Sequence, residues 1–432
     1  MQRNKGDYSI AAIKADDIKQ RMLDWSKQFS ILIFLDNNHY SSAEGAYECL
    51  LAAGALHIIG DEPSPSLALL QRTHQQNKDW LFGHICYDFK NSTEPKLTSD
   101  KPVKTGFPEL RFFVPETVCY ISRDCTTFTI ETFGATDEVY HQIIDSVITP
   151  SYRELPSLQF KQVIDKDTYI ETIEKLRTHI ADGDCYEINC CSEGYCENAV
   201  IDPMEVFHAL NKLSPAPFAA YYRLNNHYLM CASPERYMRK TGSRLLSQPI
   251  KGTARRDPDA ATDEQIKHRL SEDIKEQAEN VMITDLVRND LARCCDTGSI
   301  KVEELFGIYT FPQVHQMISS VSGTLRDDLN FTDAIHCSFP MGSMTGAPKF
   351  KVMQLIEQYE QSRRELFSGT VGYITPAGNF DFNVIIRSLF YNAATSYLCY
   401  QTGGAITYDS DPAKEWDEMR LKAWALERIF AG

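Results

Sequence analysis

The chain has 432 residues, 43% of them apolar, and a formal net charge of -15. This length permits one large domain or a few smaller ones. The negative charge argues against nucleic acid as a partner, because nucleic-acid binding depends on Lys and Arg that neutralise phosphates. A small anionic substrate is not excluded, since a few basic groups in a cleft can bind it.

The cysteines and the first residues favour a cytoplasmic protein with reduced thiols. The cysteine count is 13, an odd number, and "NCC" and "RCC" place cysteines side by side without any CxxC pair, which argues against a zinc site on sulfur. The start "MQRNKGDYSI" contains no apolar run of the signal-peptide kind. No apolar stretch approaches the ~18 residues of a membrane span.

Residues 1–150 are expected to form short strands alternating with helices. The apolar stretches that predict these strands lie at 30–36, 46–60, 80–89, 110–124 and 126–134. Residues 149–162 are rich in Pro and Ser and are read as a linker. A helix is expected over 165–184, with Ile173, Leu176 and Ile180 on one face and Asp165 or Asp167 as its cap.

Residues 160–432 contain most of the expected strands. A long helix is predicted from about Asp263 to Cys295, and a Gly-rich turn, "PMGSMTGAPK", precedes another helix. Further strands are expected at 185–195, 218–240, 244–253, 298–307, 311–325, 368–391 and 396–408. Clustered strands with only some helical crossovers favour an α+β fold over a repeated βαβ sheet.

Two predicted helices each carry a pair of carboxylates at i,i+3 spacing. Glu276 and Glu279 share a face of the first helix, and Glu415 and Glu418 repeat the spacing on the last. Asp411 and Pro412 mark the start of that last helix. Such pairs could hold Mg²⁺, which binds one or two carboxylates and completes its shell with water and substrate oxygens. Glutamate pairs are also common on solvated helix faces, so spacing alone leaves both interpretations open.

A second group of residues is suited to binding anions. Gly342 and Gly346 precede a helix start, where free amides and the helix dipole attract a carboxylate or phosphate. Arg387 ends the apolar stretch "FNVIIR" and could clamp a carboxylate with two hydrogen bonds. Gly403 and Gly404 would let the backbone approach a ligand closely. Ordinary turn glycines and a strand-end arginine remain equally open interpretations.

The stretch "LLSQPIKGTARR" places Lys251 between proline and glycine, with Arg255 and Arg256 behind it. A lysine becomes nucleophilic when its pKa falls from about 10.4 through burial or nearby positive charge. The two arginines and a nearby metal could supply that charge, so we expect a lowered pKa for Lys251. Glu235, in "SPER", is a candidate general acid. An exposed turn lysine is the alternative.

Taken together, these segments resemble the chorismate-utilising enzymes. The motifs "GDCYEIN", "SPER", "PIKGTARR", "EQAENVMITDLVRNDLAR", "PMGSMTGAPK", "GTVGYITPAGNFDFNVIIRS" and "GGAITYDSDPAKEWDEMRLKA" follow the order and rough spacing of that family. The resemblance is strong over 160–432, expected to be the chorismate-binding catalytic domain. It is weaker over 1–150, expected to be an N-terminal region of the anthranilate synthase component I type within the same sandwich. The implied fold is a large α/β-sandwich, with two β-sheets packed face to face and helices outside.

Within this family, Lys251 in "PIKGT" resembles the lysine of the aminodeoxychorismate synthases, whereas other members usually have alanine there. Isochorismate and salicylate synthases carry a water-activating lysine where this chain has Glu187, and the ammonia-using members commonly have glutamine. The resemblance therefore implies amination of chorismate at C4 in 4-aminobenzoate and folate biosynthesis, with Lys251 attacking C2 and Glu235 protonating the departing hydroxyl. Anthranilate synthase component I and a non-catalytic chorismate-binding scaffold are the alternatives.

The resemblance also implies ligand roles and a partner. Magnesium on the C1 carboxylate would be held by Glu279 and Glu418, with Glu276 and Glu415 close by. The chain has no glutaminase motif, so ammonia would come from a separate glutamine amidotransferase subunit. Two departures are Gln316, where the family often has histidine and where His315 is the neighbour, and Phe367 in place of a tyrosine. The substrate-contact positions that the resemblance implies are Arg387, Gly403, Gly404, Ala405, Ser343, Gly346, Gln316 and Phe367.

Overall fold

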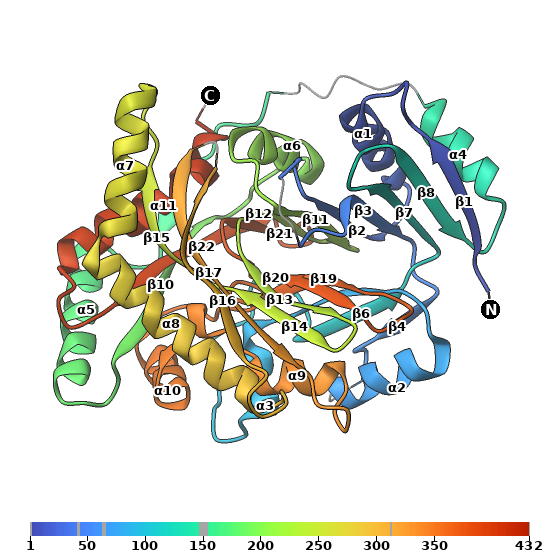
Figure 1. The fold of residues 1–432 in the computed structure, drawn as a ribbon. Helices are drawn as coiled ribbons and strands as arrows, with labels where there is room; N and C mark the ends of the chain where they lie inside the picture. The colour runs from blue at the N-terminus through green and yellow to red at the C-terminus, as the bar shows by residue number, and fades with distance from the viewer. Residues whose placement is uncertain (1, 41–43, 63–65, 147–153, 312, 432) are drawn as a thin grey trace.

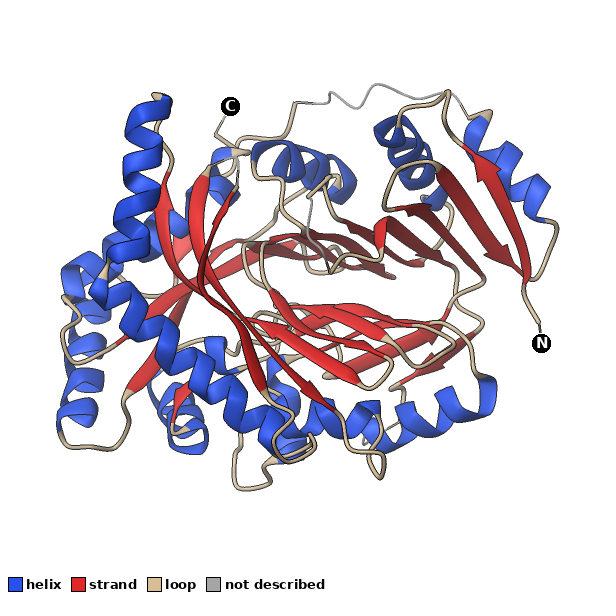
Figure 2. Ribbon diagram, in the orientation of Figure 1, coloured by secondary structure: helices blue, strands red, loops and turns tan. Residues whose placement is uncertain are grey.

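The computed structural model describes residues 2–40, 44–62, 66–146, 154–311 and 313–431. Two β-sheets lie one above the other, and helices surround them on the outside (Figures 1 and 2). Every strand pair recorded within these residues is antiparallel, and the elements are of the α+β class. The expected sandwich of two sheets with outer helices is confirmed.

The first sheet is 12-stranded, in the order β1-β8-β7-β3-β2-β11-β12-β21-β22-β10-β18, and β9 pairs with β10. Five of its strands lie within residues 1–150 and sit beside strands from the second half of the chain. The strands are β1 (Asn4–Ser9), β2 (Ile31–Asp36), β3 (Tyr47–Ala53), β7 (Thr117–Ser122), β8 (Thr127–Thr132), β9 (Lys161–Gln162), β10 (Glu187–Cys196), β11 (Phe218–Leu224), β12 (His227–Ser233), β18 (Gly346–Ala347), β21 (Ser388–Asn392) and β22 (Tyr397–Ile406).

The second sheet is 10-stranded, in the order β15-β17-β14-β13-β20-β19-β5-β6-β4, and β16 pairs with β17. It too mixes strands from both parts of the chain. The strands are β4 (His57–Ile59), β5 (Leu81–Ile85), β6 (Leu110–Val114), β13 (Arg236–Thr241), β14 (Arg244–Gln248), β15 (Ile250–Arg255), β16 (Lys301–Thr310), β17 (Val314–Thr324), β19 (Thr370–Ile374) and β20 (Phe380–Asn383). The boundary near residue 150 stays a prediction.

The helices cover the outer faces and ends of the sheets (Figure 1). Among the described residues they are α1 (Ala15–Ser26), α2 (Leu67–Asn77), α3 (Lys90–Thr93), α4 (Thr136–Ile144), α5 (Lys166–Ala181), α6 (Pro203–Leu213), α7 (Ala260–Glu272), α8 (Ile274–Ala292), α9 (Phe331–Ser338), α10 (Lys349–Tyr359) and α11 (Pro412–Arg428), with 3₁₀ turns η1 (Tyr87–Phe89) and η2 (Gly342–Met344). Asp165 caps α5 by accepting a hydrogen bond from the amide of Thr168, as expected.

The main core lies between the sheets, and the first sheet is buried on both faces. On β2, Ile31 and Ile33 point into the core between the sheets, whereas Leu32 and Phe34 pack in a second cluster with residues of α1 and α6. Side chains alternate across a strand, so a strand covered on both faces reads as one continuous apolar run. This explains the stretch "ILIFL".

The predicted helix from Asp263 to Cys295 is wrong, because the structure breaks it into α7 and α8. Asp273 adopts an extended backbone between the two helices, and its side chain accepts hydrogen bonds from the amides of Lys275 and Glu276. Aspartate competes with the helix in this way because its carboxylate can satisfy the free amides of a new first turn. Of the predicted linker 149–162, residues 149–153 lie outside the described residues, and Lys161–Gln162 form β9.

Two connections carry the chain from one sheet to the other at the same place. Pro234 and Glu235 link β12 to β13, and residues 384–387 link β20 to β21. The amide of Val384 donates to the carbonyl of Glu235 at 3.0 Å, and the amide of Ala232 donates to the carbonyl of Arg387 at 3.1 Å. The two crossings are therefore fixed to each other, and each carries one of the polar residues singled out from the sequence.

Candidate active site

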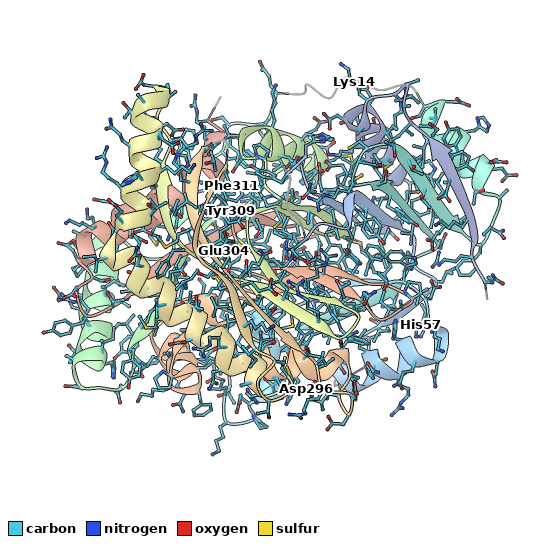
Figure 3. All side chains as sticks on the ribbon, viewed as in Figure 1. Lys14, His57, Asp296, Glu304, Tyr309 and Phe311 are labelled. Atoms are coloured by element: carbon cyan, nitrogen blue, oxygen red, sulfur yellow. The ribbon has the colours of Figure 1, made fainter. Side chains whose placement is uncertain are left out.

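A cavity of about 910 Å³ opens at these crossings and is lined by both sheets, α8 and α11. Thirteen of the fourteen residues expected from the sequence line it; Gly346 does not. They are Glu235, Lys251, Glu276, Glu279, Gln316, Ser343, Phe367, Arg387, Gly403, Gly404, Ala405, Glu415 and Glu418. Figure 3 draws the side chains on the ribbon and labels Tyr309, near the end of β16, and Phe311, which follows that strand.

A β-bulge directs Lys251 into the cavity. The pairing of β15 with β17 shifts between Ile250 and Thr253, and Gly252 has a φ of +92°. A bulge bends its strand and re-aims a side chain, and glycine takes a positive φ without steric cost. The Lys251 ammonium lies 2.6 Å from the Glu187 carboxylate, and their side chains are 10% and 4% exposed.

The expected low pKa of Lys251 is wrong. Burial alone would lower the pKa, but the carboxylates of Glu187, Glu279 and Glu235 outweigh it and raise the pKa of Lys251 above 10.5. Arg256 does not supply the expected positive charge, because its guanidinium pairs with Asp263 at 2.7 Å. Lys251 therefore rests as an ammonium ion.

Glu235 has the opposite character. It is 4% exposed, and burial raises its pKa to about 7, with a smaller opposing effect from the Ser343 hydroxyl. A carboxyl group with such a pKa is protonated at or below neutral pH and can donate a proton. The cavity thus contains an acid and an amine on neighbouring elements.

Arg387 lies at the cavity wall with a positive backbone φ. It lies after β20 rather than at the end of a strand, with a φ of +51°. Within the described residues no hydrogen bond or ion pair to its side chain is recorded, and burial lowers its pKa. Arg387 is half-buried and lines the cavity, so a bound carboxylate could pair with its guanidinium.

The carboxylate pairs of α8 and α11 meet across the cavity. Burial, and then the Glu279 charge, raise the pKa of Glu276 to about 7, and burial raises the pKa of Glu279 and Glu415. Glu418 differs, because Lys422 lies 2.7 Å away and lowers its pKa. This local excess of negative charge favours a cation.

The donor set fits Mg²⁺ by its chemistry, since carboxylate oxygens are the ligands of hard cations. Within the described residues, no three of these four glutamates bring ligand atoms within 4.8 Å of one another; only His39, Glu48 and Cys125 do so. Those three residues do not line the cavity, and Lys19 already pairs with Glu48 at 2.6 Å. The four glutamates therefore do not form a tight cluster of protein ligands in this structure.

The remaining expected contacts fall into two groups. Gly403, Gly404 and Ala405 lie on β22, and Ser343 lies in η2, all at the cavity wall. Gly346 instead pairs with Ile188 in β18, where a Cβ would overlap the Glu187 carbonyl. Its role is close packing of β18 against β10, directly behind the wall.

Several cavity residues were not identified from the sequence. Lys275 lies 3.7 Å from Glu279, and Lys422 pairs with Glu418 and donates to the carbonyl of Gly403 at 2.9 Å. Each lysine stands four residues from its glutamate, a spacing that could have revealed both ion pairs. Leu421 and Trp424 also line the cavity.

Comparisons with known proteins identify the family to which the chain is similar. A family model described as "chorismate binding enzyme" matches residues 38–428. An anthranilate synthase component I-like protein from Synechocystis sp. is 33% identical over 356 residues, which cover 82% of this chain and 73% of that protein. An aminodeoxychorismate synthase from Streptomyces griseus is 38% identical over 267 residues, which cover 62% of this chain and only 36% of the relative's length.

The solved structures show the same fold. The crystal structure of anthranilate synthase component I from Streptococcus pneumoniae superposes with a TM-score of 0.78 at 22% identity, over 90% of this chain and 94% of that chain. Within the described residues no helix is both long and apolar enough to span a membrane.

Proposed function

Because the chain belongs to the chorismate-binding enzymes, we propose that it replaces the C4 hydroxyl of chorismate with an amino group, forming 4-amino-4-deoxychorismate. The observation that carries this proposal is the buried Lys251 in the cavity wall beside the acid Glu235. A relative named aminodeoxychorismate synthase supports the same choice. A scaffold without catalysis would have no need of this arrangement.

The substrate is a dicarboxylate, and the cavity offers matching cationic and amide groups. The guanidinium of Arg387 and the backbone at Gly403–Ala405 would bind one carboxylate, with Ser343, Gln316 and Phe367 on the surrounding wall. Glu279 and Glu418 would hold Mg²⁺, with Glu276 and Glu415 nearby. A bound Mg²⁺ would withdraw electron density from the ring through its C1 carboxylate.

The reaction would proceed in two displacements. The Lys251 amine attacks C2, the two ring double bonds shift, and the C4–O bond breaks as Glu235 donates its proton, so that water leaves. Ammonia then adds at C4, the double bonds shift back, and the C2–N bond to Lys251 breaks. The name "component I-like" of the Synechocystis relative points to a second component. We propose that in this protein the second component is a glutamine amidotransferase that supplies the ammonia.

Anthranilate synthase activity is the second candidate, favoured by the name of the Synechocystis relative. The two reactions differ in a product that is simple to measure. Anthranilate formation releases pyruvate and gives a fluorescent aromatic ring, whereas 4-amino-4-deoxychorismate keeps its enolpyruvyl group. Lys251 favours 4-amino-4-deoxychorismate as the product, because only a route with a covalent amine intermediate requires this lysine.

The test is to incubate the protein with chorismate, Mg²⁺ and an ammonium salt, and to resolve the products by liquid chromatography and mass spectrometry. We expect 4-amino-4-deoxychorismate without pyruvate, and Lys251→Ala should lose at least about 100-fold in rate, apart from slow direct attack by ammonia. Fluorescent anthranilate together with pyruvate would overturn the proposal, and unchanged turnover of Lys251→Ala would exclude the covalent route.

A further inference from the structure

Glu187 forms a buried ion pair with Lys251 that the proposed reaction does not yet use. Their charged atoms are 2.6 Å apart, and both side chains are at most 10% exposed. Glu187 is not among the residues that line the cavity, whereas Lys251 is. A buried pair of this kind costs desolvation energy, which raises the question of its purpose.

The backbone around Glu187 is fixed by strands on both sides. Glu187 begins β10 and pairs with Ala347 of β18, while the next residue, Ile188, pairs with Ile406 of β22. The amide of Tyr186 donates to the carbonyl of Ala347 at 2.8 Å. The carboxylate is therefore anchored on a rigid element, as expected for a group that positions another.

The other charged groups around the pair come from several elements, and among the described residues none of their carboxylates is recorded within 4.0 Å of the Lys251 ammonium. Those that act on Lys251 at longer range are Glu235 of the crossing, Glu279 of α8, Glu418 of α11 and the thiol of Cys191 of β10. Glu187 is thus the only carboxylate of this group in hydrogen-bond contact with the amine.

We propose that Glu187 is a general base that accepts the proton of Lys251 as the amine attacks chorismate, and returns it when the amine leaves. The inference rests on the proposed function and extends it. An ammonium ion has no lone pair, so the resting Lys251 must lose a proton before it can form a bond to carbon. Glu187 is the acceptor at hydrogen-bond distance.

The protons balance over one turnover. Lys251 passes one proton to Glu187 and forms the Nζ–C2 bond, which leaves a secondary ammonium; Glu235 gives its proton to the departing hydroxyl, and water leaves. Ammonia adds at C4 and breaks the C2–N bond, so Lys251 leaves as a neutral amine. Lys251 recovers its proton from Glu187, and the new C4 ammonium returns one to Glu235. The sum is chorismate plus ammonia giving product and water.

The first experiment tests the ion pair without any substrate. Trace acetylation with acetic anhydride, followed by peptide mass spectrometry, compares Lys251 with the exposed Lys175 in wild type and in Glu187→Gln. Loss of the counter-charge lowers the pKa of Lys251, so we expect its labelling relative to Lys175 to rise about tenfold or more. Equal labelling in the two proteins would overturn the inference.

The second experiment follows the covalent step. Protein with Mg²⁺ is mixed with chorismate without ammonia, quenched at intervals, and assayed for an adduct at Lys251 by mass spectrometry. In wild type the proton moves within the pair, so the rate should be independent of pH between about 5.5 and 7. In Glu187→Gln the proton must go to solvent, and the rate should rise up to about tenfold per pH unit on the acid side.

Glu193→Gln is the matched control. Glu193 lies on the same strand, is 2% exposed and pairs with Lys104 at 3.3 Å, so it shares the burial and pairing of Glu187 but not its contact with Lys251. We expect labelling and pH profile to match wild type. Glu187→Asp retains a carboxylate with a shorter reach, and should be slower without gaining the acid limb; it also serves if Glu187→Gln folds poorly.

The outcomes separate the two levels of the hypothesis. If wild type forms the adduct and the rate in Glu187→Gln has the same pH dependence as in wild type, the role of Glu187 is overturned. The same holds if the rate in Glu187→Asp rises with pH on the acid side. Either result leaves the proposed function standing. Absence of any Lys251 adduct in a wild-type protein that still forms 4-amino-4-deoxychorismate overturns the covalent route, and this inference with it. A wild-type protein that forms no such product overturns the proposed function itself.

Discussion

His315 and Gln316 are neighbours on β17, but their side chains lie on opposite faces of the strand. His315 is buried against Asp263, 2.9 Å from its carboxylate, and Thr310, 3.0 Å from its hydroxyl. Gln316 lines the cavity, and its amide oxygen is buried without a hydrogen-bond partner among the described residues. His315 therefore cannot replace a histidine in the cavity, and Gln316 is the residue available to a ligand.

Gln316→Ala should weaken use of chorismate. A buried amide without a partner gains a hydrogen bond when a ligand arrives, so we expect kcat/KM to fall about 5- to 20-fold, equivalent to roughly 1–2 kcal/mol. Steady-state kinetics measures this. His315→Ala should instead lower the thermal midpoint while leaving KM close to wild type, and the reverse pattern would contradict the assignment of faces.

Gly252→Ala should disturb Lys251 through the bulge. Gly252 has a φ of +92°, and an added Cβ would lie 3.1 Å from both the Glu276 carboxylate and Met317. Either Glu276 or the strand must give by a few tenths of an ångström, and a misplacement of 1 Å at a reacting group can cost about 100-fold in rate. We expect turnover to fall about 10- to 100-fold in the product assay.

Gly242→Ala is the control for Gly252→Ala. Gly242 also has a positive φ, +60°, but no atom lies within 4 Å of the added Cβ. Gly242→Ala carries backbone strain of about 1 kcal/mol without crowding the cavity. Equal losses of activity would mean that the bulge does not position Lys251.

The order of the elements could be predicted from the sequence, but their boundaries could not. Strands were expected where apolar runs are bounded by turn residues, and those runs became β2, β5, β10 and β17. The break at Asp273 was missed, because "SEDIKEQ" fits a continuous helix and only the extended backbone of Asp273 reveals the cap. The order in which strands pair was not predictable either. Strand β2, near the start of the chain, pairs with β11, which lies close to the middle of the sequence.

The residues of the site were predictable, whereas the charge of Lys251 was not. The motifs, which follow one another along the sequence in the order typical of the family, identified residues that line the cavity, including both glutamate pairs. The pKa direction failed because it depends on which ions are neighbours in space: Glu187 lies 64 positions before Lys251, and Arg256 is committed to Asp263. The pKa of a buried group depends on which charges pack around it, and a local sequence pattern does not reveal those neighbours.

Arg364→Leu should destabilise the fold behind the cavity wall. The guanidinium pairs with Glu360 at 2.6 Å and donates to the carbonyls of Met344 and Asn189. Both Met344 and Asn189 line the cavity. Removing the guanidinium leaves the buried Glu360 without a counter-charge and with the amide of Cys191 as its recorded partner, at a cost of about 3–5 kcal/mol. Differential scanning calorimetry should show a clear drop in the midpoint.

Arg288→Leu is the matched control for Arg364→Leu. Arg288 pairs with Asp285, but both side chains are more than half exposed. Loss of an exposed pair changes stability by about 0.5 kcal/mol or less. Similar midpoints for the two variants would mean that the Arg364 network contributes little.

Glu279→Gln should weaken Mg²⁺ binding. It removes one anionic oxygen ligand from the carboxylate group between α8 and α11, and we expect the dissociation constant measured by isothermal titration calorimetry to rise at least about tenfold. Glu418→Gln should raise the dissociation constant for Mg²⁺ in the same way. Glu171→Gln on α5, where the side chain is 69% exposed, should bind as wild type. Unchanged binding in both cavity variants would place the cation elsewhere.

Glu235 should impose a loss of activity above neutral pH. Burial raises its pKa to about 7, so the carboxyl is protonated below that value and ionised above it. Only the protonated form can donate to the leaving hydroxyl, and kcat/KM should fall about tenfold per unit above pH 7. Steady-state assays from about pH 5.5 to 9 measure this limb. Glu235→Gln should lose most activity, because an amide does not transfer a proton.

The same raised pKa makes the folded state less stable as pH rises. The native protein keeps the Glu235 proton up to about pH 7, whereas the unfolded chain releases it near the ordinary value of 4.5. Stability is therefore fully present below pH 4.5, falls between these values and levels off above, by about 3 kcal/mol in total. Glu235→Gln removes this term, so urea unfolding at about pH 8 should show a more stable protein than wild type. Suppose that Glu235→Gln is no more stable than wild type at that pH, and that its kcat/KM still falls as pH rises above about 7. The general acid would then have to be another group.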